Sequence, residues 1–143
     1  MKISVNEYKQ NPNYTRIVNA VSACLLESNI IEPINIFVKL GYLKSENLVR
    51  WKNGEISALE SSISCNLSKA GTILRILRYH AHDMNLIPKN TVYKHKGKIL
   101  RFSKSGEEKI ERAYSTALHK ITKVPKGIIP ENMENRNQED EAI

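Results

Sequence analysis

Apolar residues recur at helical spacing through much of the first half of the chain, and they predict three helices there, over residues 14–28, 33–41 and 45–54. Pro33 suits the first turn of the second helix, and Gly41 suits its end. The apolar positions of the three helices are Ile17, Val18, Val21, Cys24, Leu25, Ile36, Phe37, Leu40, Leu48, Val49 and Trp51. The pattern therefore indicates amphipathic helices that pack around a shared core.

The longest predicted helix runs from Ser57 to Asn85. Ser57 and Glu60 have the spacing of a capping box, and Pro88 lies beyond the end of the helix. Its apolar positions alternate between spacings of four and three residues: Ile63, Leu67, Ala70, Leu74, Leu77, Ala81 and Met84. This heptad-like seam predicts packing within the chain, with a homodimer through the long helix as the alternative.

The pattern changes between residues 91 and 102. Apolar residues there flank the pair Lys96-Gly97, which suits a turn, and they predict a β-hairpin over 91–102. A loop of two residues and a loop of three both fit, and a slip of one residue would exchange the two faces of the hairpin. Ser105 then suits the cap of a last helix whose apolar stripe ends at Ile121.

These elements predict a mainly α fold, with about five helices around one long central helix and a single β-hairpin. Residues 1–13 lack a clear period and are expected to be a flexible N-terminal arm. Residues 14–124 are expected to form the helical domain, which is long enough to enclose its own core. After Pro125 the chain turns polar, so residues 125–143 are expected to be a disordered acidic tail.

Positive charge is concentrated in one segment of the chain. The formal net charge is +7, but residues 69–104 contain nine Lys or Arg against Asp83 alone, a net charge of +8. Residues 131–143 contain five acidic residues and one arginine, a net charge of −4. A body this basic favours a polyanion or an acidic protein surface as its partner. No apolar stretch is long enough to predict a membrane partner.

The sequence carries no clear catalytic, cofactor or metal signature. His80 and His82 are two positions apart on a predicted helix, about 200° around it, so they cannot share an ion. The HExxH, CxxC and phosphate-loop patterns are all missing. Cys24 falls on an apolar stripe and is predicted to be a buried hydrophobic residue, and Cys65 has no base near it in sequence. The chain is therefore predicted to be no enzyme and to hold no cofactor or metal.

A basic surface that binds nucleic acid, in a regulatory role, is the first functional hypothesis. Basic residues of the long helix and the hairpin segment would contact phosphates, and two aromatic residues would contact a base or a protein partner. The candidates are Arg75, Arg78, Lys94, Lys96, Lys98, Arg101, Lys104, Tyr93 and Trp51. A basic helix face beside a basic hairpin resembles the helix-plus-wing arrangement of winged-helix proteins. The hypothesis requires the helix and hairpin residues to meet in one patch.

Two observations leave alternatives open. Residues 45–63 contain two predicted helices joined at Gly54, as in a helix-turn-helix, but Arg50 stands four positions before that glycine, where the motif favours a small residue. Trp51 is more typical of a core anchor than of an interface. The second functional hypothesis is an adaptor or inhibitor that docks the same basic surface on an acidic partner protein, with Trp51 or Tyr93 as its anchor.

Three stretches of the sequence resemble a family of small uncharacterised bacterial proteins. They are "WKNGEISALE" with Trp51, Gly54, Leu59 and Glu60, "LRFSKSG" at residues 100–106, and "IERAY" at residues 110–114. The resemblance covers roughly residues 34–115 and implies no activity. It implies a bacterial protein in which Trp51 and the turn at residues 102–106 matter to the fold.

The acidic tail is relevant to where the protein acts. The sequence "ENMENRNQEDEAI" is similar to the glutamate-rich C-terminal signals of some type IV secretion substrates, and it implies a secreted bacterial effector or its regulator that reaches a host cytosol. The alternative is that the tail masks the basic surface of the same molecule. The polar stretch after Lys2 and the two cysteines favour the bacterial cytoplasm as the expected location.

Overall fold

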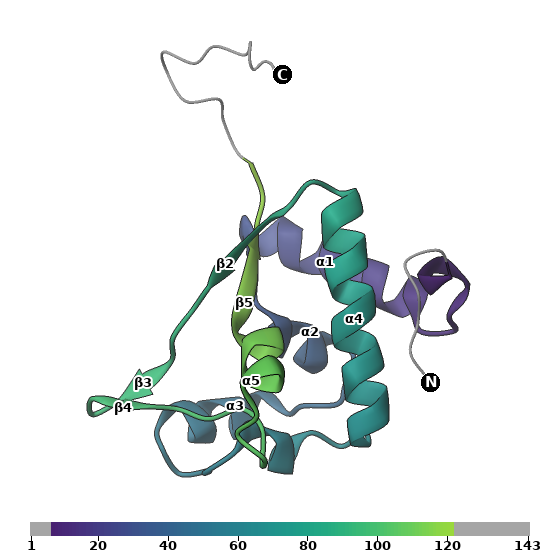
Figure 1. Ribbon diagram of the computed structural model, residues 1–143. Coiled ribbons are helices and arrows are strands. Elements are labelled where there is room, and N and C mark those ends of the chain that lie inside the picture. The colour runs from purple at the N-terminus through teal and green to yellow at the C-terminus, as the bar shows by residue number, and fades with distance from the viewer. Residues whose placement is uncertain (1–6, 122–143) are drawn as a thin grey trace, which may run out of the picture.

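The computed structural model describes residues 7–121, and residues 1–6 and the predicted acidic tail lie outside the described part (Figure 1). Within it, the elements in chain order are η1 (Tyr8–Gln10), α1 (Tyr14–Glu27), β1 (Ile30–Ile31), α2 (Pro33–Lys39), α3 (Ser45–Lys52), η2 (Leu59–Ser62), α4 (Leu67–Asp83), β2 (Ile87–Asn90), β3 (Lys94–His95), β4 (Lys98–Ile99), α5 (Glu108–Ser115) and β5 (Thr116–His119). Five α-helices and two small antiparallel sheets make a mixed α and β architecture in place of the predicted mainly α fold. The additional strands have only two to four residues, too few for an alternating pattern to reveal them.

The main sheet has three antiparallel strands in the order β1, β5, β2. Its central strand is β5, in which Leu118 lies opposite both Ile31 and Pro88. Pro88 lacks an N–H group and is tolerated because β2 is an edge strand. The prediction of a last helix that reaches Ile121 is wrong beyond Ser115. The residues after it form β5 because two strands from distant parts of the chain offer backbone partners on both sides.

The predicted helix from Ser57 to Asn85 is divided into η2 and α4. Asn66 begins α4, and its side chain accepts a hydrogen bond from the backbone N–H of Lys69 at 2.8 Å. The predicted capping box is wrong, because the carboxylate of Glu60 binds the backbone N–H of Lys104 instead. The serine-rich stretch before Asn66 favours this break, since short polar side chains compete for backbone hydrogen bonds.

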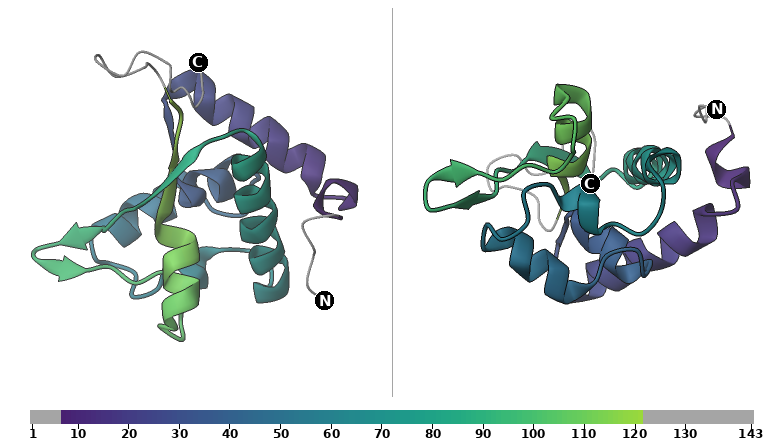
Figure 2. Two further views of the ribbon diagram at one scale, coloured as in Figure 1. Left: turned by 45° about the horizontal axis from the view of Figure 1, so that its top comes forward. Right: turned by 90° about the horizontal axis from the view of Figure 1, so that it is seen from below.

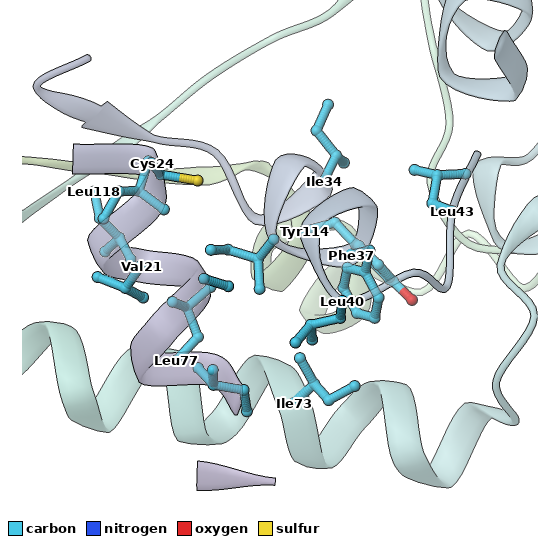
Figure 3. Packing of buried hydrophobic residues seen from close by; sticks show 14 of the residues in the cluster. Val21, Cys24, Ile34, Phe37, Leu40, Leu43, Ile73, Leu77, Tyr114 and Leu118 are labelled. Atoms are coloured by element: carbon cyan, nitrogen blue, oxygen red, sulfur yellow. The ribbon is translucent and has the colours of Figure 1, made fainter. Parts of the chain in front are cut away.

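The predicted packing of the seam within the chain is confirmed for its middle, where Ala70, Leu77 and Ala81 are buried, but not for its ends. Leu67 and Met84 are 62% and 44% exposed, whereas Ile73 and Ile76 are fully buried. Leu77 is also buried, and Figure 3 shows it between the helices together with Ile73. A homodimer through the long helix therefore has no continuous apolar seam available, because the middle of α4 packs in the core of its own chain.

The hydrophobic core lies where α1, α2, α4 and α5 meet (Figure 3). Val21, Phe37 and Leu77 point toward one another from three of these helices, and Cys24 is buried as predicted. Burying each such side chain stabilises the fold by about 1.5–3 kcal/mol. The rings of Phe37 and Tyr114 have centroids 5.7 Å apart, so the core continues into the helix that follows the hairpin.

The described part of the predicted flexible arm packs against the body. Tyr8 is only 2% exposed, its ring lies 5.5 Å from the ring of Tyr14 and 5.4 Å from that of Tyr79, and its hydroxyl donates to Asp83. The expectation of a flexible arm is therefore wrong for residues 7–13. A single aromatic side chain has no period, so the sequence pattern could not reveal this contact.

His80 makes the stability of this aromatic cluster depend on pH. Its ring is 8% exposed and lies 6.0 Å from Tyr14, and burial lowers the pKa of His80 below its usual value, with Lys9 acting in the same direction and Asp83 opposing them. Below about pH 6.5 the unfolded chain binds a proton at this residue more readily than the folded chain. The free energy of unfolding is therefore expected to fall as the pH decreases from about 6.5 toward the lowered pKa of the folded state.

Urea denaturation at a series of pH values measures this effect. The variant His80→Gln is expected to lose most of the pH dependence in that window, because the titrating group is gone. An unchanged slope in the variant would assign the pH dependence to other residues.

Candidate nucleic-acid interface

The hairpin predicted over residues 91–102 is present, with shorter strands than the sequence indicated. Strands β3 and β4 pair Lys94 with Ile99 and leave the two-residue turn Lys96-Gly97. The two turn residues have φ values of 52° and 82°, the left-handed values of a type I′ turn. The loop therefore has two residues, and the hairpin extends outward from the body (Figures 1 and 2).

Three lysines gather at the outer end of the hairpin. Lys94 lies on β3, Lys96 in the turn and Lys98 on β4, and all three side chains are exposed. Among residues 7–121, none of the three takes part in an ion pair of 4.0 Å or less. Three uncompensated charges within five residues give this end of the hairpin a strong positive potential.

The hairpin packs against the end of α3 at His95, next to the turn, and at Tyr93, before β3. The ring of His95 packs on Gly54, where a β-carbon would come within 2.9 Å of the imidazole. The ammonium group of Lys52 lies 5.9 Å from the centroid of the Tyr93 ring, and the Tyr93 hydroxyl donates to Glu32. These contacts set the direction in which the hairpin lysines point.

Replacement of Gly54 by alanine tests this docking. Gly54 has φ +77°, and the new methyl group would also meet His95, so we expect Gly54→Ala to lower the free energy of unfolding by about 1–2 kcal/mol and to increase amide exchange in the hairpin. Gly71→Ala is the matched control, because Gly71 lies on α4 with nothing within 4 Å and helix propensity there favours alanine. Equal stability of Gly54→Ala and the wild type would show that the hairpin does not depend on this contact.

The strand that leaves the hairpin is held by the segment around Trp51. The indole N–H of Trp51 donates to the carbonyl of Arg101 at 2.8 Å, and the backbone N–H of Leu59 donates to the same carbonyl at 3.2 Å. The backbone N–H of Glu60 donates to the carbonyl of Phe102 at 2.8 Å. The return path of the hairpin is thereby fixed to the body.

Two carboxylates hold the turn at residues 102–106. Glu111 accepts hydrogen bonds from the backbone N–H groups of Phe102 and Ser103 at 3.1 and 2.7 Å, and from the Ser103 hydroxyl at 2.6 Å. Glu60 accepts from the backbone N–H of Lys104 at 2.9 Å. Each carboxylate satisfies backbone donors that would otherwise lack partners in a tight turn.

Tyr114 completes the interior of this cluster. Its ring stacks on Phe102 with an interplanar angle of 3°, and its hydroxyl lies 3.5 Å from a carboxylate oxygen of Glu60. Burial, and then the charge of Glu60, raises the pKa of Tyr114, so the phenol remains a hydrogen-bond donor. Residues of three sequence stretches therefore pack together in one cluster, which holds the strand that leaves the hairpin. The stretches are "WKNGEISALE", "LRFSKSG" and "IERAY".

Both predicted aromatic contact residues pack within the protein, Trp51 fully buried and Tyr93 half-buried. Trp51 is fully buried, and its rings pack against Tyr93 and Phe102 with centroid distances of 5.4 and 5.0 Å. The Tyr93 hydroxyl is bonded to Glu32, and burial raises the pKa of Tyr93 with that carboxylate contributing. The Trp51 ring is therefore unavailable to stack on a base or to anchor a partner, and this part of the predicted site is wrong. The half-buried Tyr93 ring packs in the same aromatic cluster.

Two basic residues of the predicted site have structural partners. The guanidinium of Arg101 donates to the carbonyls of Ser103 and Lys104 at 3.1 and 2.7 Å, so it closes the turn instead of facing a ligand. The backbone N–H of Lys104 is bound by Glu60, while its side chain is exposed. Both side chains are exposed, but only that of Arg101 is held by hydrogen bonds to the turn.

The predicted single patch of helix arginines and hairpin lysines is divided. Figures 1 and 2 place α4 and the hairpin on opposite sides of α5 in every view. Arg75 is half-buried on α4, and the guanidinium of Arg78 lies 5.6 Å from the centroid of the Tyr79 ring. The division arises because α4 packs against α1 and η1, away from the hairpin. The candidate interface is therefore restricted to the hairpin side.

The sequence reasoning missed the exposed face of α3. Leu48 and Trp51 are buried, and the opposite face carries Val49, Arg50 and Lys52, next to the hairpin. The signal was present, since charged residues flank the tryptophan on both sides. This charge pattern did not indicate a site because only the tertiary structure brings the end of α3 beside the hairpin.

A shallow groove of about 270 Å³ lies between the hairpin stem and α5. Val92 and Ile99 line it and are 62% and 71% exposed. Glu108, Glu111 and Arg112 contribute its polar side. The groove adds apolar surface beside the lysines.

Comparison of the chain with protein-family models, with curated protein sequences and with solved structures found no match. Within residues 7–121, no helix combines the length and the apolar character needed to cross a bilayer.

Proposed function

We propose that this protein is a non-enzymatic module that binds nucleic acid through the lysines of its hairpin. The observation that carries the proposal is the geometry of Lys94, Lys96 and Lys98. They are exposed, they lack ion-pair partners among residues 7–121, and they stand on a hairpin that packs against the end of α3. A fixed group of uncompensated ammonium groups binds phosphates without first breaking ion pairs within the protein.

The order of the elements supports the proposal. The helix α1, the short strand β1 and the helix α2 precede α4 and β2, and the hairpin lies between β2 and the central strand β5. Winged-helix proteins combine helices, a small antiparallel sheet and a projecting hairpin in a similar order. The chain has more helices than that arrangement needs, so the likeness concerns the hairpin as a wing.

Fluorescence anisotropy with labelled nucleic acids tests the proposal. We expect the wild-type protein to bind, with an affinity that falls steeply between about 50 mM and about 200 mM salt because binding releases counterions from the phosphates. Lack of binding to duplex DNA, single-stranded DNA and RNA at the lowest salt would overturn the proposal.

Exposed Val92 and Ile99 favour a second candidate, an adaptor that docks on an acidic protein surface. In that case the lysines would steer association, and the apolar pair beside the groove would supply buried area. The discriminating result is a stoichiometric complex that survives nuclease treatment and that weakens when Ile99 is replaced by aspartate. If the purified protein binds nucleic acid and the replacement of Ile99 by aspartate leaves that affinity unchanged, the first candidate is favoured.

A further inference from the structure

The helix α3 and the hairpin form adjacent parts of one surface. The packing of His95 on Gly54 and the approach of Lys52 to Tyr93 place the end of α3 against the hairpin (Figure 1). One face of α3 is buried through Leu48 and Trp51. Its other face is open to solvent and carries polar, acidic, apolar and basic side chains: Ser45, Glu46, Val49, Arg50 and Lys52.

The connection between α2 and α3 is rigidly supported. The five residues 40–44 include Gly41 at φ +87°, which suits a compact turn between two helices. Arg16 donates to the carbonyl of Leu40 at 2.7 Å and to the hydroxyl of Tyr42 at 2.9 Å. The backbone N–H of Ser64 donates to the carbonyl of Tyr42 at 2.8 Å. This support keeps α3 in a fixed orientation relative to the hairpin.

We propose that α3 is the helix that enters the major groove of duplex DNA while the hairpin lysines contact the phosphates beside it. The proposal rests on the nucleic-acid binding proposed above and names both the ligand and the second contact element. The major groove, about 12 Å wide, admits one α-helix and displays hydrogen-bonding edges and thymine methyl groups. Arg50 and Val49 match these two kinds of group.

Arg50 can exchange its present partner for a base. Its only ion pair within residues 7–121 is with Glu55, at 3.4 Å, and both side chains are 56% exposed. An exposed pair of this kind contributes little free energy. A guanine edge that accepts two hydrogen bonds from a guanidinium is a stronger partner. Val49 is 56% exposed in the middle of the same helix, and its apolar side chain suits a thymine methyl group.

Duplex DNA fits this surface better than a single strand. Recognition of unpaired bases relies on exposed aromatic rings. Trp51 and Phe102 are buried, and the half-buried Tyr93 packs against both, with its hydroxyl bonded to Glu32. The aromatic rings next to the hairpin therefore pack against one another within the protein. A projecting helix and a basic hairpin remain, and both suit a groove flanked by two phosphate backbones.

The variants Val49→Glu and Gly71→Glu provide a matched test, with a random-sequence duplex about two helical turns long, ~21 base pairs, as the probe. Each adds one negative charge at an exposed helical position, the first on α3 and the second on α4. We expect Val49→Glu to weaken binding by about 10- to 100-fold and Gly71→Glu by less than about twofold. Methyl green, which occupies the major groove, is expected to compete with the wild-type protein, and distamycin, which occupies the minor groove, is not.

The possible outcomes separate the two proposals. Normal binding by Val49→Glu, combined with loss of binding when Lys94, Lys96 and Lys98 are all replaced by alanine, would overturn the role of α3. The hairpin interface would then remain supported. If Gly71→Glu loses more affinity for the duplex than Val49→Glu does, α4 and not α3 is the helix that enters the major groove. Tighter binding to the single strand than to the duplex, or no competition from methyl green, would also overturn the inference. Absence of all binding by the wild type would overturn both proposals.

Discussion

Replacing Trp51 with alanine is expected to lower the free energy of unfolding by about 3–5 kcal/mol. The indole is fully buried and packs against the rings of Tyr93 and Phe102, so its removal leaves a cavity that the surrounding rings cannot fill. The change also removes the hydrogen bond to the carbonyl of Arg101, where the chain leaves the hairpin. The effect should therefore reach the hairpin as well as the core.

Circular dichroism during urea denaturation measures this effect, because Trp51 is the only tryptophan and its fluorescence is lost with it. Trp51→Phe is the matched control. It retains most of the apolar volume, and the Arg101 carbonyl still accepts a hydrogen bond from Leu59, so we expect a smaller loss of about 1–2 kcal/mol. A loss below about 1 kcal/mol for Trp51→Ala would contradict the structural role given to this residue.

The triple variant Lys94→Ala, Lys96→Ala, Lys98→Ala should weaken nucleic-acid binding by about two orders of magnitude at ~0.1 M salt. If each lysine neutralises one phosphate of a duplex, the slope of log affinity against log salt should become shallower by about 2.7. The thermal stability should change little, because the three side chains are exposed and none has an ion-pair partner within residues 7–121.

A control variant with the same loss of charge separates a local interface from general attraction. Arg78→Ala, Lys109→Ala and Lys120→Ala remove three positive charges from exposed positions on α4, on α5 and after β5. We expect this variant to retain most of the affinity and most of the salt dependence. If both variants lose affinity equally, net charge alone drives binding, and the hairpin is not a defined interface.

Local signals in the sequence were sufficient for several elements. Helices over 14–28 and 33–41 were predicted close to the observed α1 and α2, since amphipathic spacing and a proline at the first helical turn act over a few residues. The turn Lys96-Gly97 was recognised because left-handed backbone conformations favour glycine. The exposure of the hairpin lysines followed from their charge.

Contacts between distant parts of the chain were beyond the reach of these signals. The residues of β5 have a helical stripe in sequence, yet they form a strand because β1 and β2 lie on either side of them. Glu60 has the position of a capping residue, yet its carboxylate binds a backbone group 44 residues away. Both outcomes depend on partners that periodicity does not identify.

The sequence by itself determined the amphipathic helices, the hairpin turn and the positive charge on that turn, because each depends on neighbours within about one helical turn. Only the tertiary structure decided that Trp51 is buried, that the Tyr93 hydroxyl binds Glu32, that α4 lies away from the hairpin, and that α3 lies beside it. The physical reason is that burial and side-by-side placement depend on packing between segments far apart in sequence, where one backbone group or one ring selects its partner from the whole chain.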